Sequence, residues 1–167
     1  MGSLIWERTM CAYLEARTGF RPFLLRGKER SIQGMTMTDN PKTILVVDDE
    51  DSVRNLAAMV LEEGGYQVLK ARHSDEALIM LDSYKDTVHL LLTDVKMDPF
   101  LTGCELAKCI RLLRPDIVVL YVSGFASHPM VQQEVEEGRA TFLAKPFSAK
   151  DLLSKVRESL VAAARPA

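Results

Sequence analysis

The sequence lacks any run of apolar residues long enough to cross a membrane. Its longest runs hold about six residues, as at 117–122, whereas a transmembrane helix needs about 20. The amino terminus has no apolar core of a signal peptide, because charged residues follow directly on Trp6. A net charge of −2 and a pI near 5.9 lack the basic excess typical of nucleic-acid-binding proteins. We therefore expect neither a membrane nor a nucleic-acid partner.

Cysteine and histidine are also scarce. The three residues of each kind are dispersed: Cys11, Cys104, Cys109, His73, His89 and His128. No Cys-x-x-Cys pair occurs, and Cys104 and Cys109 are five positions apart, so a helix would not place them on one face. These spacings indicate neither a disulfide framework nor a zinc motif. We expect a cytoplasmic protein with free thiols.

The first 40 residues differ from the rest of the chain. They contain six basic and four acidic residues, a charge of +2, which leaves −4 for the other 127 residues. No helical or strand period runs through them, although residues 10–14 could form a helical turn. We expect a poorly ordered extension over 1–40, a folded domain over 41–162 and a short tail over 163–167. There are two alternatives for the extension. It could be an arm that binds a partner, or it could result from a start assigned upstream of a natural start at Met37.

A repeated strand and helix pattern begins at Thr43. Five short apolar runs, rich in β-branched residues and bounded by turn residues, predict buried parallel strands. They span residues 44–47, 68–71, 88–94, 117–122 and 141–144. A segment that reads as a helix follows each strand. The first of these helices has a predicted apolar face of Val53, Leu56, Ala57, Val60 and Leu61.

Turn and capping residues delimit the predicted helices. Gly64 and Gly65 end the first helix, and Ser74 is expected to cap the second. Two capping boxes start later helices: Thr102 with Glu105, and Ser148 with Asp151. Five strand and helix units in roughly 120 residues predict an α/β fold, a three-layer sandwich with a parallel sheet between two layers of helices.

Polar residues end or directly follow four of the predicted strands: Asp48, Asp49, Asp94, Ser123 and Lys145. The carboxyl ends of parallel strands lie at one edge of the sheet, where open α/β folds bind their ligands. Asp94 is the leading candidate for chemistry, because a buried apolar run ends abruptly on its carboxylate.

These residues and their surroundings resemble the receiver domain of two-component response regulators. The matching fragments are VVDDE (46–50), LLLTDVKM (90–97), the G-x-E-L at 103–106, YVSGFA (121–126) and FLAKPF (142–147). The resemblance covers about residues 42–160 and implies a flavodoxin-like sheet of strand order 2-1-3-4-5. The carboxyl-terminal part is most similar to stand-alone receivers and to terminal receivers of hybrid histidine kinases.

The resemblance implies that Asp94 is the phosphoacceptor. It also makes Asp48 and Asp49 the acidic pair that binds Mg²⁺, with Asp94 and the main-chain carbonyl of Lys96 as further ligands. Three carboxylates within ~4 Å repel by about 4 kcal/mol per pair at an effective dielectric near 20, so such a cluster favours a cation. Mg²⁺ takes oxygen ligands and, together with Lys145, would balance the formal charge. Mg²⁺ is therefore the expected cofactor.

The same resemblance gives roles to the later strands. Ser123 is implied to bond a phosphoryl oxygen through its hydroxyl, and Lys145 to supply a positive charge to the phosphate. The Lys145–Pro146 peptide bond is expected to be cis. Phe142 stands at the aromatic switch position, which would work together with Ser123; an ordinary core phenylalanine is the alternative.

The loop after Asp94 departs from the family pattern. Between Asp94 and Gly103 it is one residue longer than usual, with Asp98 as the added residue. Lys96 and Phe125 stand at the two positions that flank the path of an attacking water in the family. We therefore expect a comparatively long-lived aspartyl phosphate. Packing of Phe125 against the next helix is the alternative.

The expected function is that of a phosphoaccepting signalling domain and not of an enzyme with a substrate of its own. Its partners would be a sensor histidine kinase or a histidine phosphotransfer protein, and an unknown downstream protein, since no output domain follows before the last residue. A haloacid-dehalogenase-like phosphatase is a second hypothesis, but it needs an acid where Lys96 stands. A phosphate-independent binding module is a third, but the acid and lysine set is complete here.

Overall fold

The computed structural model describes residues 16, 41–97, 101–124 and 128–164. The chain divides into two units, Met1–Pro41 and Lys42–Ala167, and the strands and helices given below all lie in the second. The predictions for the amino-terminal extension, including the turn at 10–14, fall almost wholly outside the described residues. Asp98 and Phe125 lie outside them as well, so the expectations for the lengthened loop and for phosphate lifetime stay predictions.

In its described residues, the second unit consists of five parallel strands that alternate with five helices. The strands are β1 (Thr43–Val47), β2 (Gln67–Ala71), β3 (Leu90–Asp94), β4 (Val118–Ser123) and β5 (Ala140–Ala144). The helices are α2 (Asp51–Glu63), α3 (Ser74–Ser83), α4 (Gly103–Leu113), α5 (Pro129–Glu136) and α6 (Ala149–Ala163). The sheet has the order β2-β1-β3-β4-β5, which confirms the predicted α/β fold and its flavodoxin-like topology.

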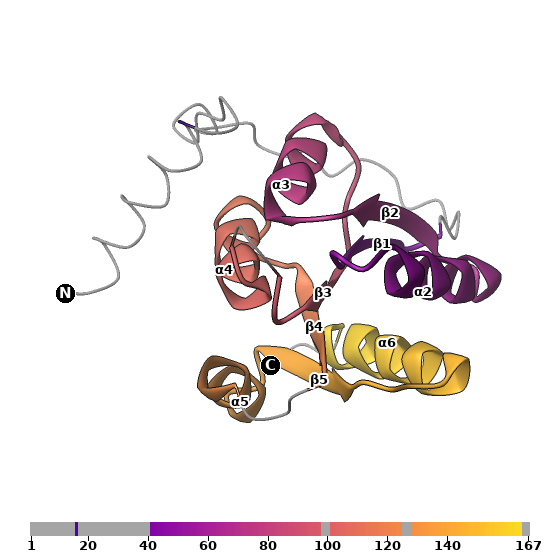
Figure 1. Cartoon of the computed structure of the whole chain (residues 1–167). Coiled ribbons are helices and arrows are strands. Elements are labelled where there is room, and N and C mark those ends of the chain that lie inside the picture. Colours follow the sequence, from indigo (N-terminus) through magenta and orange to yellow (C-terminus); the bar gives the residue numbers. More distant parts are fainter. Residues whose placement is uncertain (1–15, 17–40, 98–100, 125–127, 165–167) are drawn as a thin grey trace. The chain divides into compact units, whose positions relative to one another are not determined.

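The helices form two layers, one on each face of the sheet. Helices α2 and α6 cover one face, and α3, α4 and α5 cover the other (Figure 1). The central strands β1 and β3 are buried on both faces, and most of their residues are accordingly apolar. Burying each leucine or valine of this kind stabilises the fold by roughly 1.5–3 kcal/mol. No helix in the described ranges is long and apolar enough to span a membrane.

The buried face of α2 is rotated relative to the predicted one. Leu56 is 52% exposed, whereas Arg54 is only 6% exposed and Ala58 is buried. Arg54 turns inward because its guanidinium donates a hydrogen bond to the main-chain carbonyl of Asp48. The prediction was wrong at Leu56 because periodicity alone treats an arginine as a solvent-facing residue. The other buried positions agree with it: Ala57, Val60 and Leu61.

The predicted cap of α3 is also wrong. His73, with an extended backbone, is the N-cap, and its Nδ1 accepts from the N–H of Glu76 at 3.3 Å. Ser74 is instead the first helical residue and is fully buried. Its Oγ accepts a hydrogen bond from the N–H of Leu101 at 3.2 Å, which ties the loop after β3 to α3. The two predicted capping boxes form as expected: Thr102 with Glu105, and Ser148 with Asp151.

We expect His89 to make the stability of the fold sensitive to acid. Its Nδ1 accepts a hydrogen bond from the N–H of Thr43 at 3.0 Å, which requires an unprotonated nitrogen. Burial lowers the pKa of His89 below its ordinary value of 6.5, and Lys42 adds to this. Below pH about 6.5 the unfolded chain therefore binds more protons than the folded one, so the free energy of unfolding falls as the pH drops.

We predict that His89→Gln, which does not titrate, reduces this acid sensitivity. Urea unfolding of both proteins at about pH 7.5 and pH 5.5 measures it, because every other titrating group is shared. The wild type should lose more of its unfolding free energy between the two pH values than the variant does. Equal losses in both proteins would show that His89 is not a source of the pH dependence.

Candidate functional site

The register of the parallel sheet brings the predicted site residues to one edge. Asp48 directly follows β1, whose last residue pairs with the residue before Asp94 in β3. Asp94 in turn pairs with the residue before Ser123 in β4. Ser123 pairs with the residue before Lys145, at the end of β5. All four residues therefore lie at nearly the same level on the carboxyl edge of the sheet, as the sequence predicted.

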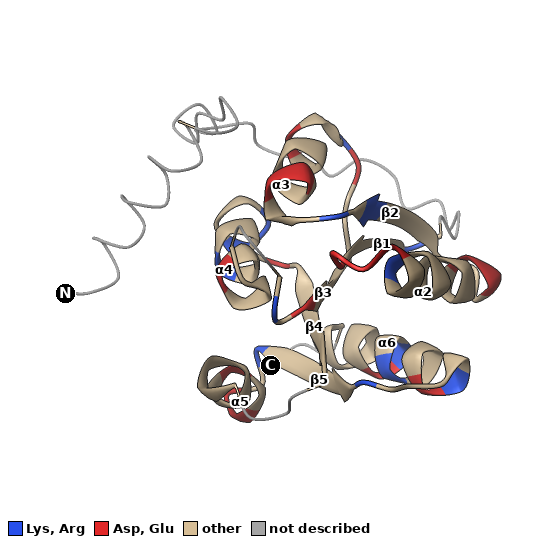
Figure 2. Cartoon of the chain, in the orientation of Figure 1, with Lys and Arg blue, Asp and Glu red and all other residues tan. Residues whose placement is uncertain are grey.

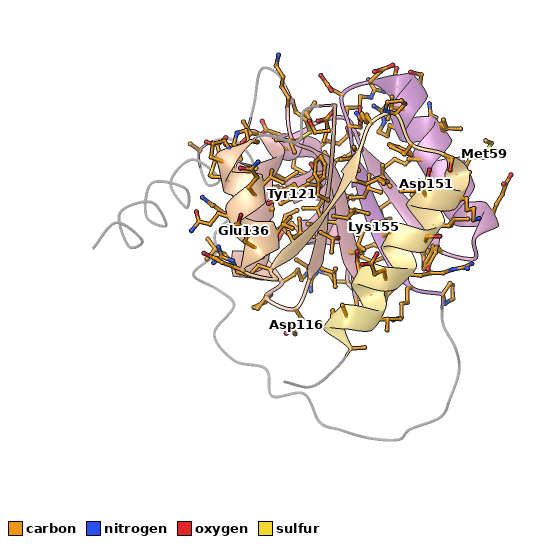
Figure 3. The ribbon with its side chains drawn as sticks, turned by 90° about the horizontal axis from the view of Figure 1, so that it is seen from below. Met59, Asp116, Tyr121, Glu136, Asp151 and Lys155 are labelled. Carbon is orange, nitrogen blue, oxygen red and sulfur yellow. The ribbon has the colours of Figure 1, made fainter. Side chains whose placement is uncertain are left out.

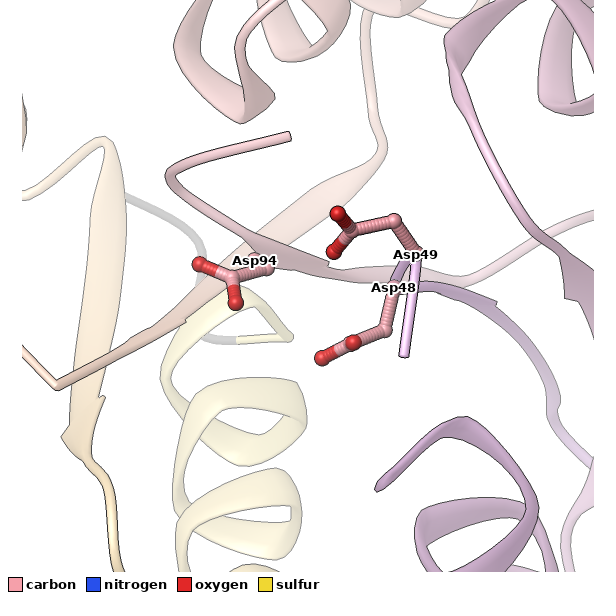
Figure 4. Close-up of side chains that lie close together, drawn as sticks. All are labelled: Asp48, Asp49 and Asp94. Atoms are coloured by element: carbon pink, nitrogen blue, oxygen red, sulfur yellow. The ribbon is translucent and has the colours of Figure 1, made fainter. Parts of the chain in front are cut away.

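Three carboxylates converge at this edge. Each of Asp48, Asp49 and Asp94 has an oxygen within 4.8 Å of the corresponding oxygens of the other two (Figure 4). Acidic residues are concentrated where β1 runs into α2 (Figure 2). Asp48 is buried, Asp94 is partly exposed and Asp49 is exposed, so the cluster opens to solvent on the Asp49 side. A set of carboxylate oxygens at this spacing fits a hard divalent cation.

Lys145 joins two of these acids. Its Nζ lies 2.8 Å from Oδ2 of Asp48 and 2.6 Å from Oδ2 of Asp94. Burial by itself would lower the pKa of Lys145, but the two carboxylates outweigh burial and raise that pKa. Burial also raises the pKa of Asp48, while Lys145 and the N–H of Glu50 act in the opposite direction. Lys145 is thus held as a cation between two strands of the sheet.

Main-chain donors orient the two buried or partly buried acids. Oδ1 of Asp94 accepts from the N–H of Lys96 at 3.0 Å, so Oδ2 is the oxygen that faces Lys145. Oδ1 of Asp48 accepts from the N–H of Glu50 at 2.9 Å, which leaves its Oδ2 to Lys145 in the same way. Both carboxylates therefore have fixed directions before any ligand arrives.

Gly103 lets the start of α4 approach Asp94 closely. A Cβ on Gly103 would lie 2.0 Å from the carbonyl oxygen of Asp94 and 3.0 Å from Oγ1 of Thr93. The N–H of Gly103 donates to the carbonyl of Val95 at 3.1 Å, so this approach is part of the loop's hydrogen bonding. The sequence indicated Gly103 only as part of a family fragment and not as a support for Asp94.

The remaining predicted residues occupy different surroundings. Ser123 is 4% exposed, and its carbonyl accepts from the N–H of Lys145 at 2.8 Å. Phe142 is only partly buried on the edge strand β5 and is not one of the fully buried core residues. Lys96 is exposed. The Lys145–Pro146 peptide bond is cis, as the resemblance implied.

A buried polar cluster beside β4 was not predicted. Oε2 of Glu134 accepts from the hydroxyl of Tyr121 at 2.8 Å and from the guanidinium of Arg111 at 2.9 Å. Glu134 is 4% exposed, and burial together with this carboxylate raises the pKa of Tyr121. Figure 3 shows Tyr121 between the sheet and α5. One oxygen thus joins α4, β4 and α5, and only the acid's position on the inner face of α5 could have signalled it.

Sequence reasoning also missed Arg54. It stands three positions before Ala57 and seven before Leu61, a spacing that places it on the apolar face of α2. That spacing was the available signal, because an arginine on an inward face is rarely buried without a specific partner.

Comparison with known proteins relates this fold and site to one family. Residues 44–157 match the response regulator receiver domain family. Sensor kinase CckA of Brucella abortus strain 2308 is 34% identical over 133 residues, which are 80% of this chain and 14% of that kinase. Response regulator receiver protein CpdR of the same strain is 31% identical over 122 residues, 73% of this chain and 99% of CpdR.

Solved structures give the same result. A CheY-like response regulator receiver domain protein from Methanospirillum hungatei has a TM-score of 0.66 and 31% identity, over 74% of this chain and 96% of its own. The receiver domain of the hybrid histidine kinase CckA has a TM-score of 0.59 and 36% identity, over 71% and 98%. This chain, with its five alternating strands and helices and its acidic strand edge, belongs to the response regulator receiver domain family.

Proposed function

We propose that this receiver accepts a phosphoryl group on Asp94 from a histidine kinase or a histidine phosphotransfer protein. The observation that carries the proposal is the setting of Asp94, which ends β3, contacts Lys145 at 2.6 Å and lies within 4.8 Å of two further acids. Such a carboxylate is held in a fixed direction and is partly accessible to solvent. The Oδ–phosphorus bond would form as the bond from phosphorus to the donor breaks, which makes an acyl phosphate.

Asp48, Asp49 and Asp94, with the main-chain carbonyl of Lys96, would hold Mg²⁺. The donor set supports this choice, because it consists of hard oxygen ligands that repel one another without a cation. When bound, Mg²⁺ would supply positive charge to the phosphoryl oxygens. Lys145 supplies charge from the other side, so that the phosphoryl group would displace Lys145 from part of its contact with Asp94.

Ser123 and Phe142 would transmit the effect of phosphorylation at Asp94 to the surface of the domain. The Ser123 hydroxyl stands one residue beyond the partner of Asp94 in the sheet, a place from which it can donate to a phosphoryl oxygen. Phe142 is partly exposed and lacks a hydroxyl, so any response of Phe142 would come through packing. The chain spans 14% of CckA and 99% of CpdR. The function we favour is that of a receiver that signals by binding a partner protein or by passing its phosphoryl group onward.

Phosphorylation by acetyl phosphate tests the proposal. The wild-type protein, with Mg²⁺, should gain the mass of one phosphoryl group in intact-mass spectra, and should gain none with a metal chelator. Asp94→Asn, which keeps the shape of the side chain but removes the nucleophilic carboxylate, should gain none in either condition. Labelling of Asp94→Asn equal to that of the wild type would place the acceptor elsewhere and overturn the assignment.

A further inference from the structure

Arg54 is an unusual residue for its position. It lies in α2, five residues after Asp49, and it is 6% exposed although it carries a permanent charge. Buried arginines are rare, and they need partners that compensate for lost hydration. Its ion-pair partner is Asp51 in the same helix, whose side chain is 76% exposed. That pair alone gives no reason for the guanidinium to be turned inward.

The inward contact of Arg54 is with the main chain of a site residue. Nη1 donates to the carbonyl oxygen of Asp48 at 2.7 Å, and this bond is buried. The Asp48 N–H donates to the carbonyl of Ala71 in β2 at 3.3 Å. Both main-chain polar groups of Asp48 are therefore anchored, one to the neighbouring strand and one to α2. A charge-assisted bond of this kind is stronger than a neutral one.

This contact complements those made by the Asp48 side chain. Its Oδ1 is held by the N–H of Glu50, and its Oδ2 by Lys145, so the carboxylate has a defined orientation only if the main chain below it is fixed. The same turn carries Asp49, whose carboxylate comes from the next residue along the chain. A shift in this turn would move two of the three acids away from Asp94 together.

We propose that Arg54 is a positioning residue of the acidic site. By holding the carbonyl of Asp48 it fixes the turn between β1 and α2, and thereby the distance of the Asp48 and Asp49 carboxylates from Asp94. The inference rests on the proposed Mg²⁺-assisted phosphoryl transfer for its biological meaning. The property that Arg54 controls is the arrangement of the carboxylates in the metal-free protein, which sets how readily they bind a divalent cation.

Three variants separate this role from general stability. Arg54→Met removes the donors and the charge at similar length. Arg54→Lys keeps a charge and a single donor nitrogen, and Asp51→Asn breaks only the exposed ion pair. Calorimetric titration with Mg²⁺ gives the Kd of each folded protein. Arg54→Met should weaken Mg²⁺ binding by roughly 10–100-fold, as loss of a supporting contact does. Arg54→Lys should recover part of this loss, and Asp51→Asn should stay within about twofold of the wild type.

Urea unfolding with chelator and with Mg²⁺ provides the second readout. Mg²⁺ adds to the unfolding free energy of a protein that binds it in the folded state. If Arg54 is a positioning residue, Arg54→Met should lose a larger fraction of this added unfolding free energy than of the unfolding free energy measured in chelator. If Arg54→Met does not fold, Arg54→Gln, which keeps an N–H donor without the charge, takes its place beside Arg54→Lys. An unchanged Kd in the folded variants, or an equal loss of stability with and without Mg²⁺, would overturn the inference, as would a wild-type protein that does not bind Mg²⁺.

Phosphorylation measured on the same samples keeps the two proposals apart. If the wild type binds Mg²⁺ and takes no phosphoryl group, the proposed function fails while the Kd values still decide the role of Arg54. If the wild type is phosphorylated on Asp94 and every variant binds Mg²⁺ equally well, the role of Arg54 fails and the proposed function stands.

Discussion

Asp49→Asn is expected to weaken Mg²⁺ binding by at least about tenfold, and also to stabilise the metal-free protein. Asp49 lies within 4.8 Å of two other carboxylates, whereas the ion pairs that Lys145 makes within the described residues are with Asp48 and Asp94. In the absence of metal its charge is therefore repelled without a direct counter-charge from Lys145. Water screens the exposed Asp49, so the gain should be on the order of 1 kcal/mol and not the larger value of a buried pair.

Chemical denaturation in chelator and calorimetric titration with Mg²⁺ measure the two opposite effects. Asp116→Asn is the matched control, because it removes the same charge from an exposed turn before β4. Figure 3 shows Asp116 at the end of the domain opposite to Asp151, far from the carboxyl edge of the sheet. Asp116→Asn should change neither the unfolding free energy in chelator nor the Kd for Mg²⁺ appreciably. A metal-free Asp49→Asn protein that is less stable than the wild type would contradict repulsion within the acidic cluster.

Gly103→Ala is expected to damage both the fold and the site. The added Cβ would lie 2.0 Å from the carbonyl oxygen of Asp94, a contact that no rotation of a side chain can relieve. Either α4 or the end of β3 must move, and such overpacking typically costs about 1–3 kcal/mol, occasionally more. Because the displaced group is the main chain of the proposed phosphoacceptor, the rate of phosphorylation by acetyl phosphate should fall as well.

Gly124→Ala controls for the general effect of replacing a glycine near the site. A Cβ on Gly124 meets no described atom within 4 Å, so its unfolding free energy should stay close to that of the wild type. Thermal unfolding and the time course of phosphorylation give both readouts for each variant. If Gly103→Ala is as stable as the wild type, α4 can move away from β3 at little cost in free energy. The close approach of Gly103 would then not be needed to hold Asp94 in place.

Sequence reasoning was most successful where a pattern repeats. The five apolar runs and the polar residues at their ends predicted the strands and the edge at which Asp48, Asp94 and Lys145 meet. This worked because parallel strands joined by right-handed crossovers leave little freedom in where their carboxyl ends lie. Boundaries were less accurate: the third strand begins at Leu90 and not at Val88.

The features that sequence reasoning missed depend on contacts between distant parts of the chain. Serine is a residue type that often caps helices, but the hydroxyl of Ser74 accepts a hydrogen bond from the N–H of Leu101, 27 positions later. Arginine is usually a surface residue, but the guanidinium of Arg54 donates a hydrogen bond to the buried main-chain carbonyl of Asp48. Glu134 likewise faces inward to Tyr121 and Arg111. In each case a local preference was overridden by a polar partner that only the folded chain brings near.

The bridge made by Lys145 has a consequence for the order of folding. Its partners Asp48 and Asp94 precede it by 97 and 51 positions, and β5, at the edge of the sheet, is separated from β3 by β4. Contacts of such long sequence separation carry a larger loop-closure entropy cost than local contacts, so we expect them to form after the local ones. A nascent or partly folded chain in which β5 has not docked would carry its acids without their cation. Docking of β5 therefore completes the described sheet and brings the counter-charge of Lys145 to the two acids in the same step.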